Sequence, residues 1–163
     1  MITALAIFIV WQLIYDIYLL PDGRLDKFLS ISGVNAASKI LSFIGFSIES
    51  HGRIISCVGA RPVEINNGCN GLQLFGMFIG FILSYPGSWK NRFILTITGS
   101  ITLFIANGLR ISFFAVFNAY YPKYWNLAHE SSSYIFFYPV VLIFWYICTQ
   151  ISNEDSLLNE LQT

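Results

Sequence analysis

The chain has 163 residues, of which 55% are hydrophobic and only 11% charged, and its formal net charge at pH 7 is zero. An ordinary globular domain carries about 25% charged residues, so this composition, with several apolar runs of near-spanning length, predicts an integral membrane protein. The zero net charge and the lack of a long basic run argue against a nucleic-acid partner, and three cysteines fit no disulfide scaffold.

Five apolar segments predict an all-α membrane protein, a polytopic helical bundle that forms one domain over residues 1–163 and carries a small extracytoplasmic loop or hairpin. The first segment has neither a basic n-region nor a small-residue cleavage site, so we expect a span and not a signal peptide. The second has a polar stripe at helical spacing; we expect it to span, with a position in the interface as the alternative. In chain order the predicted spans lie near residues 2–20, 28–46, 69–85, 92–118 and 134–150.

Two long polar connections follow the second and the fourth span. In the first, residues 53–58 and 63–65 predict a small β-hairpin. The second, residues 119–133, is predicted to be a loop that holds His129. Five spans place both connections on one side of the membrane. The short turns and the acidic tail, which we expect to be partly helical, lie on the other side, and the Lys and Arg distribution slightly favours a cytoplasmic C-terminus.

The stretch Asn-Asn-Gly-Cys-Asn-Gly-Leu-Gln, residues 66–73, places Cys69 between two glycines and several amides at the mouth of the third span. Gly68 and Gly71 allow a neighbour or a substrate to approach the backbone closely. A thiol in this setting is accessible to a polar substrate. Two structural alternatives stay open: Cys69 is a packing residue, as free cysteines usually are, or it forms a disulfide with Cys57.

The predicted topology brings a thiol, a guanidinium and an imidazole to one membrane face. Arg110 lies inside the fourth span, about two turns from its end, and an arginine there indicates a functional site unless it forms an ion pair or snorkels to the interface. Asn107 lies on the same helix face as Arg110. Beside Cys69, His129 is the expected proton acceptor. Gln73 shares a face with Cys69 and with the G-x-x-x-G pair of the third span, which suits tight packing beside the polar residues of the fourth span.

Three motifs in this order resemble the exosortase/archaeosortase family of membrane cysteine transpeptidases. They are Gly-Cys-Asn-Gly-Leu at 68–72, Ala-Asn-Gly-Leu-Arg at 106–110 and Ala-His-Glu at 128–130. The family carries a Cys-Ser-Gly-like motif, an Asn-x-x-Arg motif and a following His on successive outward-facing helix ends. Asn70 stands where the family usually has Ser, and the chain is shorter than the eight-span members, so it resembles a minimal form of the core.

The resemblance implies a multi-pass thiol protease or transpeptidase of the cytoplasmic (inner) membrane, with its active site on the extracytoplasmic side and no metal or organic cofactor. Its substrates would be exported proteins whose C-terminal tail has a short motif, an apolar helix and basic residues, and an amine-bearing envelope acceptor would receive the new carboxyl end. Cys69 would be the nucleophile, His129 the general acid/base and Arg110 the stabiliser of the oxyanion. The residues assigned to supporting or substrate-binding roles are Asn70, Gly71, Gln73 and Asn107.

Two other functions stay open at this point. The chain could be a non-catalytic membrane subunit or a transporter-like protein, in which Lys39, Arg110 and the polar stripe of the second span line a path. It could also be a membrane hydrolase that shares the site but only cleaves. Alkylation from outside by a polar maleimide separates a reactive Cys69 from a packing one.

Overall fold

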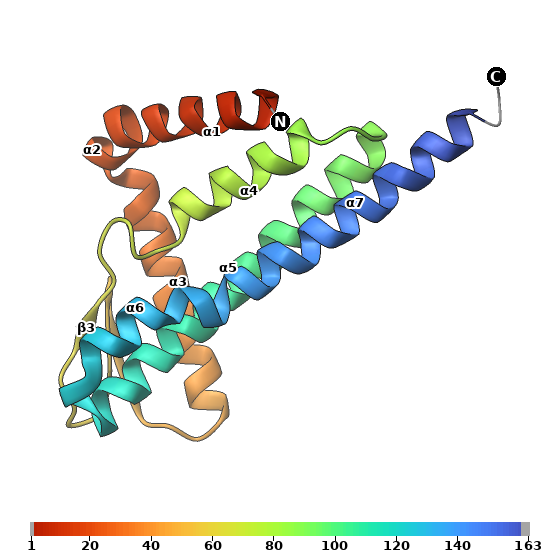
Figure 1. The fold of residues 1–163 in the computed structure, drawn as a ribbon. Coiled ribbons are helices and arrows are strands. Elements are labelled where there is room, and N and C mark those ends of the chain that lie inside the picture. Colours follow the sequence, from red (N-terminus) through yellow and green to blue (C-terminus); the bar gives the residue numbers. More distant parts are fainter. Residues whose placement is uncertain (1, 161–163) are drawn as a thin grey trace.

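A computed structural model describes residues 2–160 and shows a mainly helical protein with one small β-sheet (Figure 1). The predicted all-α membrane fold is confirmed. The acidic tail is helical as far as Glu160, and residues 161–163 of it lie outside the described part. In chain order the elements are α1 (Ile2–Ile14), the π-helical turn η1 (Tyr15–Leu19), α2 (Leu20–Asp22), α3 (Arg24–Phe43), β1 (Ile48–His51), β2 (Ile54–Cys57), β3 (Val63–Glu64), α4 (Leu72–Ser84), α5 (Trp89–Tyr120), the 3-10 turn η2 (Pro122–Tyr124), α6 (Trp125–Phe136) and α7 (Tyr138–Glu160).

Within the part of the chain that the structure describes, 3 helical segments are long and apolar enough to cross a membrane. They cover Leu5–Asp22, Trp89–Tyr120 and Pro122–Ile151. Helix α4 is also apolar but has only 13 residues, whereas a perpendicular span needs about 20. Helix α3 has 20 residues but a more polar composition. Crossing by α3 and α4, and the boundaries of the five predicted spans, therefore stay predictions.

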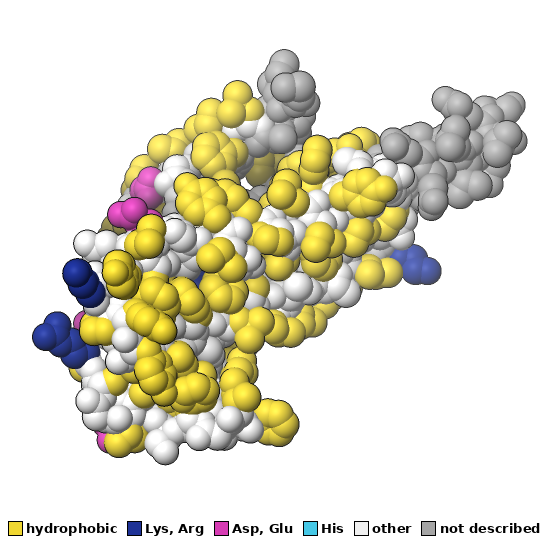
Figure 2. All heavy atoms as spheres, turned by 60° about the horizontal axis from the view of Figure 1, so that its bottom comes forward, with side chains coloured by type: hydrophobic (Ala, Val, Ile, Leu, Met, Phe, Trp, Pro, Cys, Tyr) yellow, Lys and Arg dark blue, Asp and Glu magenta, His cyan; other side chains and the backbone are white. Residues whose placement is uncertain are grey.

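The outer surface of the long helices is strongly apolar. On α5, Phe93, Ile97 and Ile101 are 67%, 44% and 56% exposed, and α1 and α7 carry similar exposed side chains. Figure 2 shows hydrophobic side chains over the long middle part of one face, with charged side chains toward its ends. A contiguous apolar surface of this kind is unfavourable in water. It indicates that lipid surrounds these helices.

Close contact between α4 and α1 explains the G-x-x-x-G pair. A Cβ atom on Gly76 would lie 2.0 Å from the indole of Trp11, and one on Gly80 would lie 2.7 Å from Ile7 Cγ2. The indole N–H of Trp11 also donates to the main-chain oxygen of Gln73 at 3.0 Å. We expected this face of α4 to pack beside the polar residues of the fourth span. That expectation is wrong, because the two glycines contact α1.

The connection after α3 forms a three-stranded antiparallel sheet in the order β1-β2-β3. The predicted hairpin is confirmed as the pair β2–β3, in which Ile55 faces Val63, and β1 is an additional strand that was not predicted. Buried side chains of the sheet pack against the C-terminal half of α5, where Ile55, Val63 and Ile65 share a core with Ile111 and Phe114. The sheet therefore lies at the end of α5 that leads into the second long connection.

The second long connection, predicted to be a loop over residues 119–133, is instead largely helix α6. Ala128 and Ser132 lie one turn apart and are buried, which allows α6 to pack closely against α5. The sequence did not indicate this helix, because the segment is polar overall and the residues that it buries are small and not strongly hydrophobic. His129 consequently lies on a helix that is fixed to α5, and not in a loop.

Helix α3 packs across α5 with its small and apolar face. Val34 and Ala37 are fully buried on that face, whereas Asn35 and Lys39 of the predicted polar stripe are exposed on the other side. A path lined by Lys39 and Arg110 is therefore not formed, because Arg110 is buried on α5. The transporter-like alternative loses its structural basis.

Candidate active site

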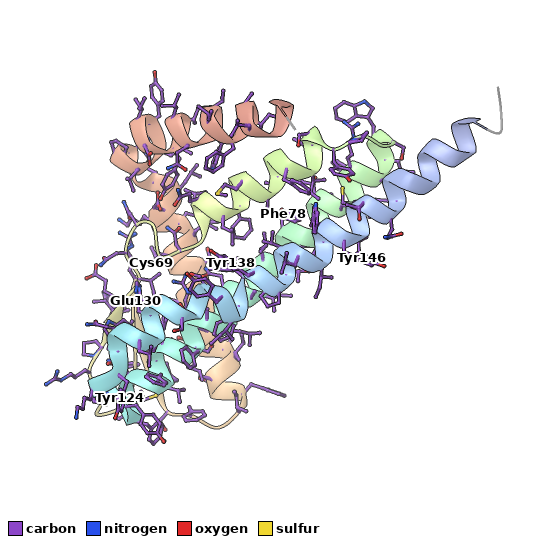
Figure 3. All side chains as sticks on the ribbon, viewed as in Figure 1. Cys69, Phe78, Tyr124, Glu130, Tyr138 and Tyr146 are labelled. Atoms are coloured by element: carbon purple, nitrogen blue, oxygen red, sulfur yellow. The ribbon has the colours of Figure 1, made fainter. Side chains whose placement is uncertain are left out.

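Cys69 and His129 come from segments far apart in the sequence and meet where the loop before α4 faces α6. Their Sγ and Nε2 atoms are 3.4 Å apart. Figure 3 labels Cys69 and Glu130, the neighbour of His129, in the same region of the molecule. Both Cys69 and His129 are partly exposed and line one cleft of about 640 Å³. A thiol and an imidazole at this distance can exchange a proton, and a substrate entering the cleft can reach both.

The local sequence places Cys69 in a turn immediately before α4. The third span was predicted to begin at Cys69, but the helix begins at Leu72. Gly71 has a φ of 86°, a left-handed conformation that glycine adopts without strain. Because this conformation is not that of a right-handed helix, α4 does not extend back to Cys69. The Asn70 Oδ1 atom accepts a hydrogen bond from Leu72 N at 2.9 Å and caps the first turn. Cys69 thus lies beside a helix N-terminus, where the helix dipole favours negative charge.

A buried hydrogen-bond network fixes this turn to α3. Asn70 is fully buried, and its Nδ2 donates to Asp26 Oδ1 at 2.7 Å and to the main-chain oxygen of Asp26 at 2.9 Å. The same carboxylate accepts from Gly68 N at 3.4 Å. Ser30 Oγ lies 3.4 Å from Asn70 Nδ2. The amide at position 70 therefore holds the turn from inside while its neighbour Cys69 faces the cleft.

Asp26 and Ser30 were not predicted as site residues. Both are fully buried, four positions apart on one face of α3. Asp26 was assigned to the polar connection after the first span, because a short stretch that contains Arg24, Asp26 and Lys27 has the composition of a loop. The signal that indicates it is helical spacing, since Asp26 and Ser30 lie in line with Gly33 and Val34 on the buried face.

Helix α5 holds the same turn from the opposite side. Asn107 Nδ2 donates to the main-chain oxygen of Asn70 at 2.8 Å, and Arg110 Nη1 donates to that of Cys69 at 3.1 Å. The spacing of three residues places both side chains on one helix face, as expected. The carbonyl groups of Cys69 and Asn70, two successive residues of the turn, are thereby fixed by one helix.

Arg110 also connects the turn to α6. Its Nε donates to Ser132 Oγ at 2.9 Å, and that hydroxyl donates to the main-chain oxygen of His129 at 2.7 Å. The guanidinium carbon lies 4.9 Å from the ring centroid of Phe114 and 5.1 Å from that of Phe137. The cation is thus held between two aromatic rings whose faces interact favourably with its charge.

The two structural alternatives for Arg110 do not apply. Among residues 2–160, the recorded salt bridge joins Arg24 to Asp22, so no carboxylate neutralises Arg110. The side chain is only 5% exposed, so it does not snorkel to an interface. A cation kept inside the bundle by neutral hydrogen-bond partners costs several kcal/mol on insertion scales, which indicates that it serves a site.

Aromatic contacts orient the imidazole. The ring of His129 stacks on Phe114 with the centroids 5.5 Å apart and the planes at 24°, and it lies 5.8 Å from the ring of Trp125. Glu130, next in the chain, is exposed. The rings of Phe114 and Trp125 therefore fix the direction in which Nε2 points, and Phe114 contacts both Arg110 and His129.

Gln73 lies to one side of the cysteine–histidine pair. Its Nε2 donates to Gln12 Oε1 of α1 at 2.9 Å. It lines a second cavity of about 300 Å³ together with Gly71 and Arg110. This second cavity extends along α4 toward Phe137, at the start of α7.

The other cysteines take no part in this arrangement. Cys57, Cys69 and Cys148 are all free, so the alternative of a Cys57–Cys69 disulfide is wrong. Cys57 Sγ lies 3.8 Å from the main-chain oxygen of Ala115, and burial raises the pKa of its thiol above the usual value. Among the described residues, no group of three or more His, Cys, Asp and Glu side chains is arranged to hold a metal ion.

A protein-family model described as "Transmembrane exosortase (Exosortase_EpsH)" matches residues 2–146 of the chain. No curated protein and no solved structure matches it. The matched region includes the turn that holds Cys69, α5 and α6, and hence every side chain of the site described above.

Proposed function

Because the chain belongs to the transmembrane exosortase family, a family of membrane proteases and transpeptidases, we propose that Cys69, His129 and Arg110 form the active site of a thiol transpeptidase. It cleaves C-terminal sorting signals of exported proteins through an acyl-enzyme. The observation that carries this proposal is the 3.4 Å contact between Cys69 Sγ and His129 Nε2 at the wall of an open cleft. The function rests on this pair and on the buried cation beside it.

In the first step His129 Nε2 accepts the proton of the Cys69 thiol, and the sulfur attacks the scissile carbonyl carbon. A carbon–sulfur bond forms while the carbonyl π electrons move to oxygen and produce a tetrahedral oxyanion. When the carbon–nitrogen bond breaks, the protonated imidazole returns its proton to the leaving amine. The products are a thioester on Cys69 and the released C-terminal tail.

Arg110 stabilises the oxyanion. Its Nε and Nη1 hold Ser132 and the Cys69 carbonyl, and no hydrogen bond is recorded for Nη2 among the described residues. We assign Nη2 as the donor to the oxyanion. A cation that is largely buried between Phe114 and Phe137 and preorganised by its hydrogen bonds stabilises developing charge far better than a solvated one.

The thioester is resolved by an amine of an envelope acceptor, and hydrolysis by water is the competing outcome. In the second half-reaction His129 removes a proton from the incoming amine, and the nitrogen attacks the thioester carbonyl. The carbon–sulfur bond then breaks, and the protonated imidazole returns its proton to the sulfur, which regenerates the Cys69 thiol. The protein acts in the cytoplasmic membrane with its cleft on the extracytoplasmic side, where the exported substrate remains held by its own apolar helix.

The test is processing of an exported reporter that ends in a short motif, an apolar helix and basic residues, the tail being taken from a protein encoded beside this one. Cys69→Ala abolishes processing at an unchanged membrane level, whereas the matched variant Cys148→Ala processes normally. With the active chain, intact-mass analysis detects the thioester on Cys69 when acceptor amine is withheld. Normal processing by Cys69→Ala contradicts the assignment, and product ending in a free carboxylate in every condition favours the hydrolase alternative.

A further inference from the structure

The free edge of the sheet faces the nucleophile. Ile65 N donates to Arg53 O at 2.9 Å, and Ile55 pairs with Val63. In an antiparallel ladder, successive residues direct their N–H and C=O groups to opposite edges. Glu64, between these two bonded positions, therefore directs both main-chain groups away from β2. Within the described residues no hydrogen bond to either group is recorded.

This edge forms one wall of the cleft that contains Cys69 and His129. Residues 61–66 line one side of the cleft, and Phe114, Trp125 and His129 line the other. Figure 1 shows β3 beside α6, on which His129 lies. Directly after the edge, the main-chain oxygen of Asn66 accepts a hydrogen bond from Cys69 N at 3.0 Å. The unpaired edge thus continues into the turn that carries the nucleophile.

We propose that the outer edge of β3 binds the substrate as an extended peptide, which pairs with the main-chain N–H and C=O of Glu64 and presents its scissile carbonyl to Cys69. This inference rests on the proposed function. The N–H and C=O of Glu64 can pair with the C=O and N–H of one residue of an extended peptide. A substrate bound in this way adds a strand to the sheet, and its main chain supplies affinity whatever its side chains are.

The opposite wall determines what the side chains of the bound strand meet. Successive side chains of an extended peptide point to opposite faces. Those directed into the cleft meet Trp125, a partly exposed ring of the lining, which packs on the buried ring of Phe114 with the centroids 5.3 Å apart. The side chain of Glu64 is exposed and lies on the opposite face from Val63 and Ile65. Recognition at this edge therefore depends on the main chain of Glu64 and not on its carboxylate.

The experiment measures alkylation of Cys69 by a peptide electrophile relative to a small one. In the full chain with Cys57→Ser and Cys148→Ser, Cys69 is the remaining thiol. The probes are acetyl-Ala-Ala-Ala chloromethyl ketone and iodoacetamide, and intact mass gives both rates. Glu64→Pro removes the N–H at this edge, and Glu64→Ala shows what the side chain alone contributes. Ser50→Pro is the matched control. Ser50 lies on β1 opposite Ile55 of β2, at a position where its N–H points away from β2. The proline therefore also removes an outward-facing N–H, but at the other edge of the sheet.

Glu64→Pro is expected to lower the ratio of the peptide rate to the iodoacetamide rate about tenfold relative to Glu64→Ala, the effect of losing one or two hydrogen bonds. Ser50→Pro should leave this ratio unchanged. If Glu64→Pro and Glu64→Ala give equal ratios, the edge does not bind peptide. That result leaves the proposed function untouched, because reporter processing by the Cys69→Ala variant tests it independently.

If Glu64→Pro also slows the alkylation of Cys69 by iodoacetamide, the proline has disturbed the turn that holds Cys69. A second comparison then tests whether the edge binds peptide. On the chain with an unaltered β3, the same peptide with N-methylated amides should react about tenfold more slowly than the unmethylated peptide, since it lacks the donors for an added strand. Equal rates for the two peptides overturn the proposal.

Discussion

Arg110 combines two tasks that depend on the shape of its guanidinium. The planar group bonds Ser132 through Nε and the Cys69 carbonyl through Nη1, which fixes its orientation and leaves Nη2 for the oxyanion contact that we propose. A lysine ammonium is a compact point charge on a flexible stem and does not reproduce this fork. The position therefore needs arginine for geometry as well as for charge.

Arg110→Lys should keep a near-normal membrane level but lower substrate processing about 10²–10³-fold, the usual effect of removing one oxyanion donor. Pulse-chase of the reporter at matched enzyme levels measures this. Arg24→Lys, on an exposed arginine that does not line the cleft, serves as the control. Wild-type processing by Arg110→Lys would reduce the active site to Cys69 and His129.

The pH dependence of Cys57 alkylation should report the burial of this thiol. Burial raises the pKa of Cys57, so at a given pH a smaller fraction is the reactive thiolate and alkylation is slower. The measurement uses the Cys69→Ala, Cys148→Ala variant, in which Cys57 is the remaining thiol. The rate at which maleimide alkylates Cys57 should rise with pH in both native and SDS-denatured protein. The rise should occur at higher pH in the native protein, because the pKa of the buried thiol is higher. Identical pH–rate curves for native and denatured protein would contradict the burial of Cys57.

At the scale of elements, the contact between α1 and α4 depends on the lack of a side chain at position 76. The Trp11 indole lies where a Cβ would be, and its N–H bonds the main chain of Gln73. Gln73 in turn holds Gln12. Because α4 begins directly after the turn that holds Cys69, this contact positions the site indirectly.

Gly76→Ala should destabilise the protein by about 1–3 kcal/mol, the usual cost of overpacking. Thermal unfolding in detergent measures the change. Gly108→Ala is the matched control, because its added Cβ would meet no atom nearer than 3.6 Å, and it should be neutral or slightly stabilising through helix propensity. In a double-mutant cycle, Trp11→Ala should make Gly76→Ala less costly; strict additivity would show that the two side chains do not compete for the same space.

At the scale of the whole molecule, α5 separates the site from the opposite membrane face. Its 32 residues extend about 48 Å at 1.5 Å per residue, which exceeds a hydrocarbon core of about 30 Å. Lys90 lies at its start, and Lys123 lies just beyond its end, on the side of the cleft. Both are exposed, so they report on the two sides of the membrane.

In a cysteine-free background, Lys123→Cys should react in intact cells with a membrane-impermeant maleimide, and Lys90→Cys should react only after the membrane is permeabilised. This pattern follows from an extracytoplasmic cleft. The reverse pattern would place the cleft in the cytoplasm and contradict the proposed action on exported proteins.

Much of this protein follows from local sequence alone. Low charge and apolar runs determine a helical membrane protein, and the order of the Cys69, Arg110 and His129 motifs points to the family. The spacing of Asn107 and Arg110 places both on one helix face, because helical periodicity is a local property. The hairpin of β2 and β3 was predictable for the same reason, since short-range turn chemistry directs it.

What only the tertiary structure decided is which faces meet. The glycine face of α4 packs on α1, and α6 is a helix because Ala128 and Ser132 pack against α5. Asp26 of α3 supports the turn that holds Cys69. Each of these depends on contacts between segments distant in the chain. Hydrophobicity and periodicity show that a helix has a face to bury, but the partner of that face is selected by the fit of side chains across the whole bundle.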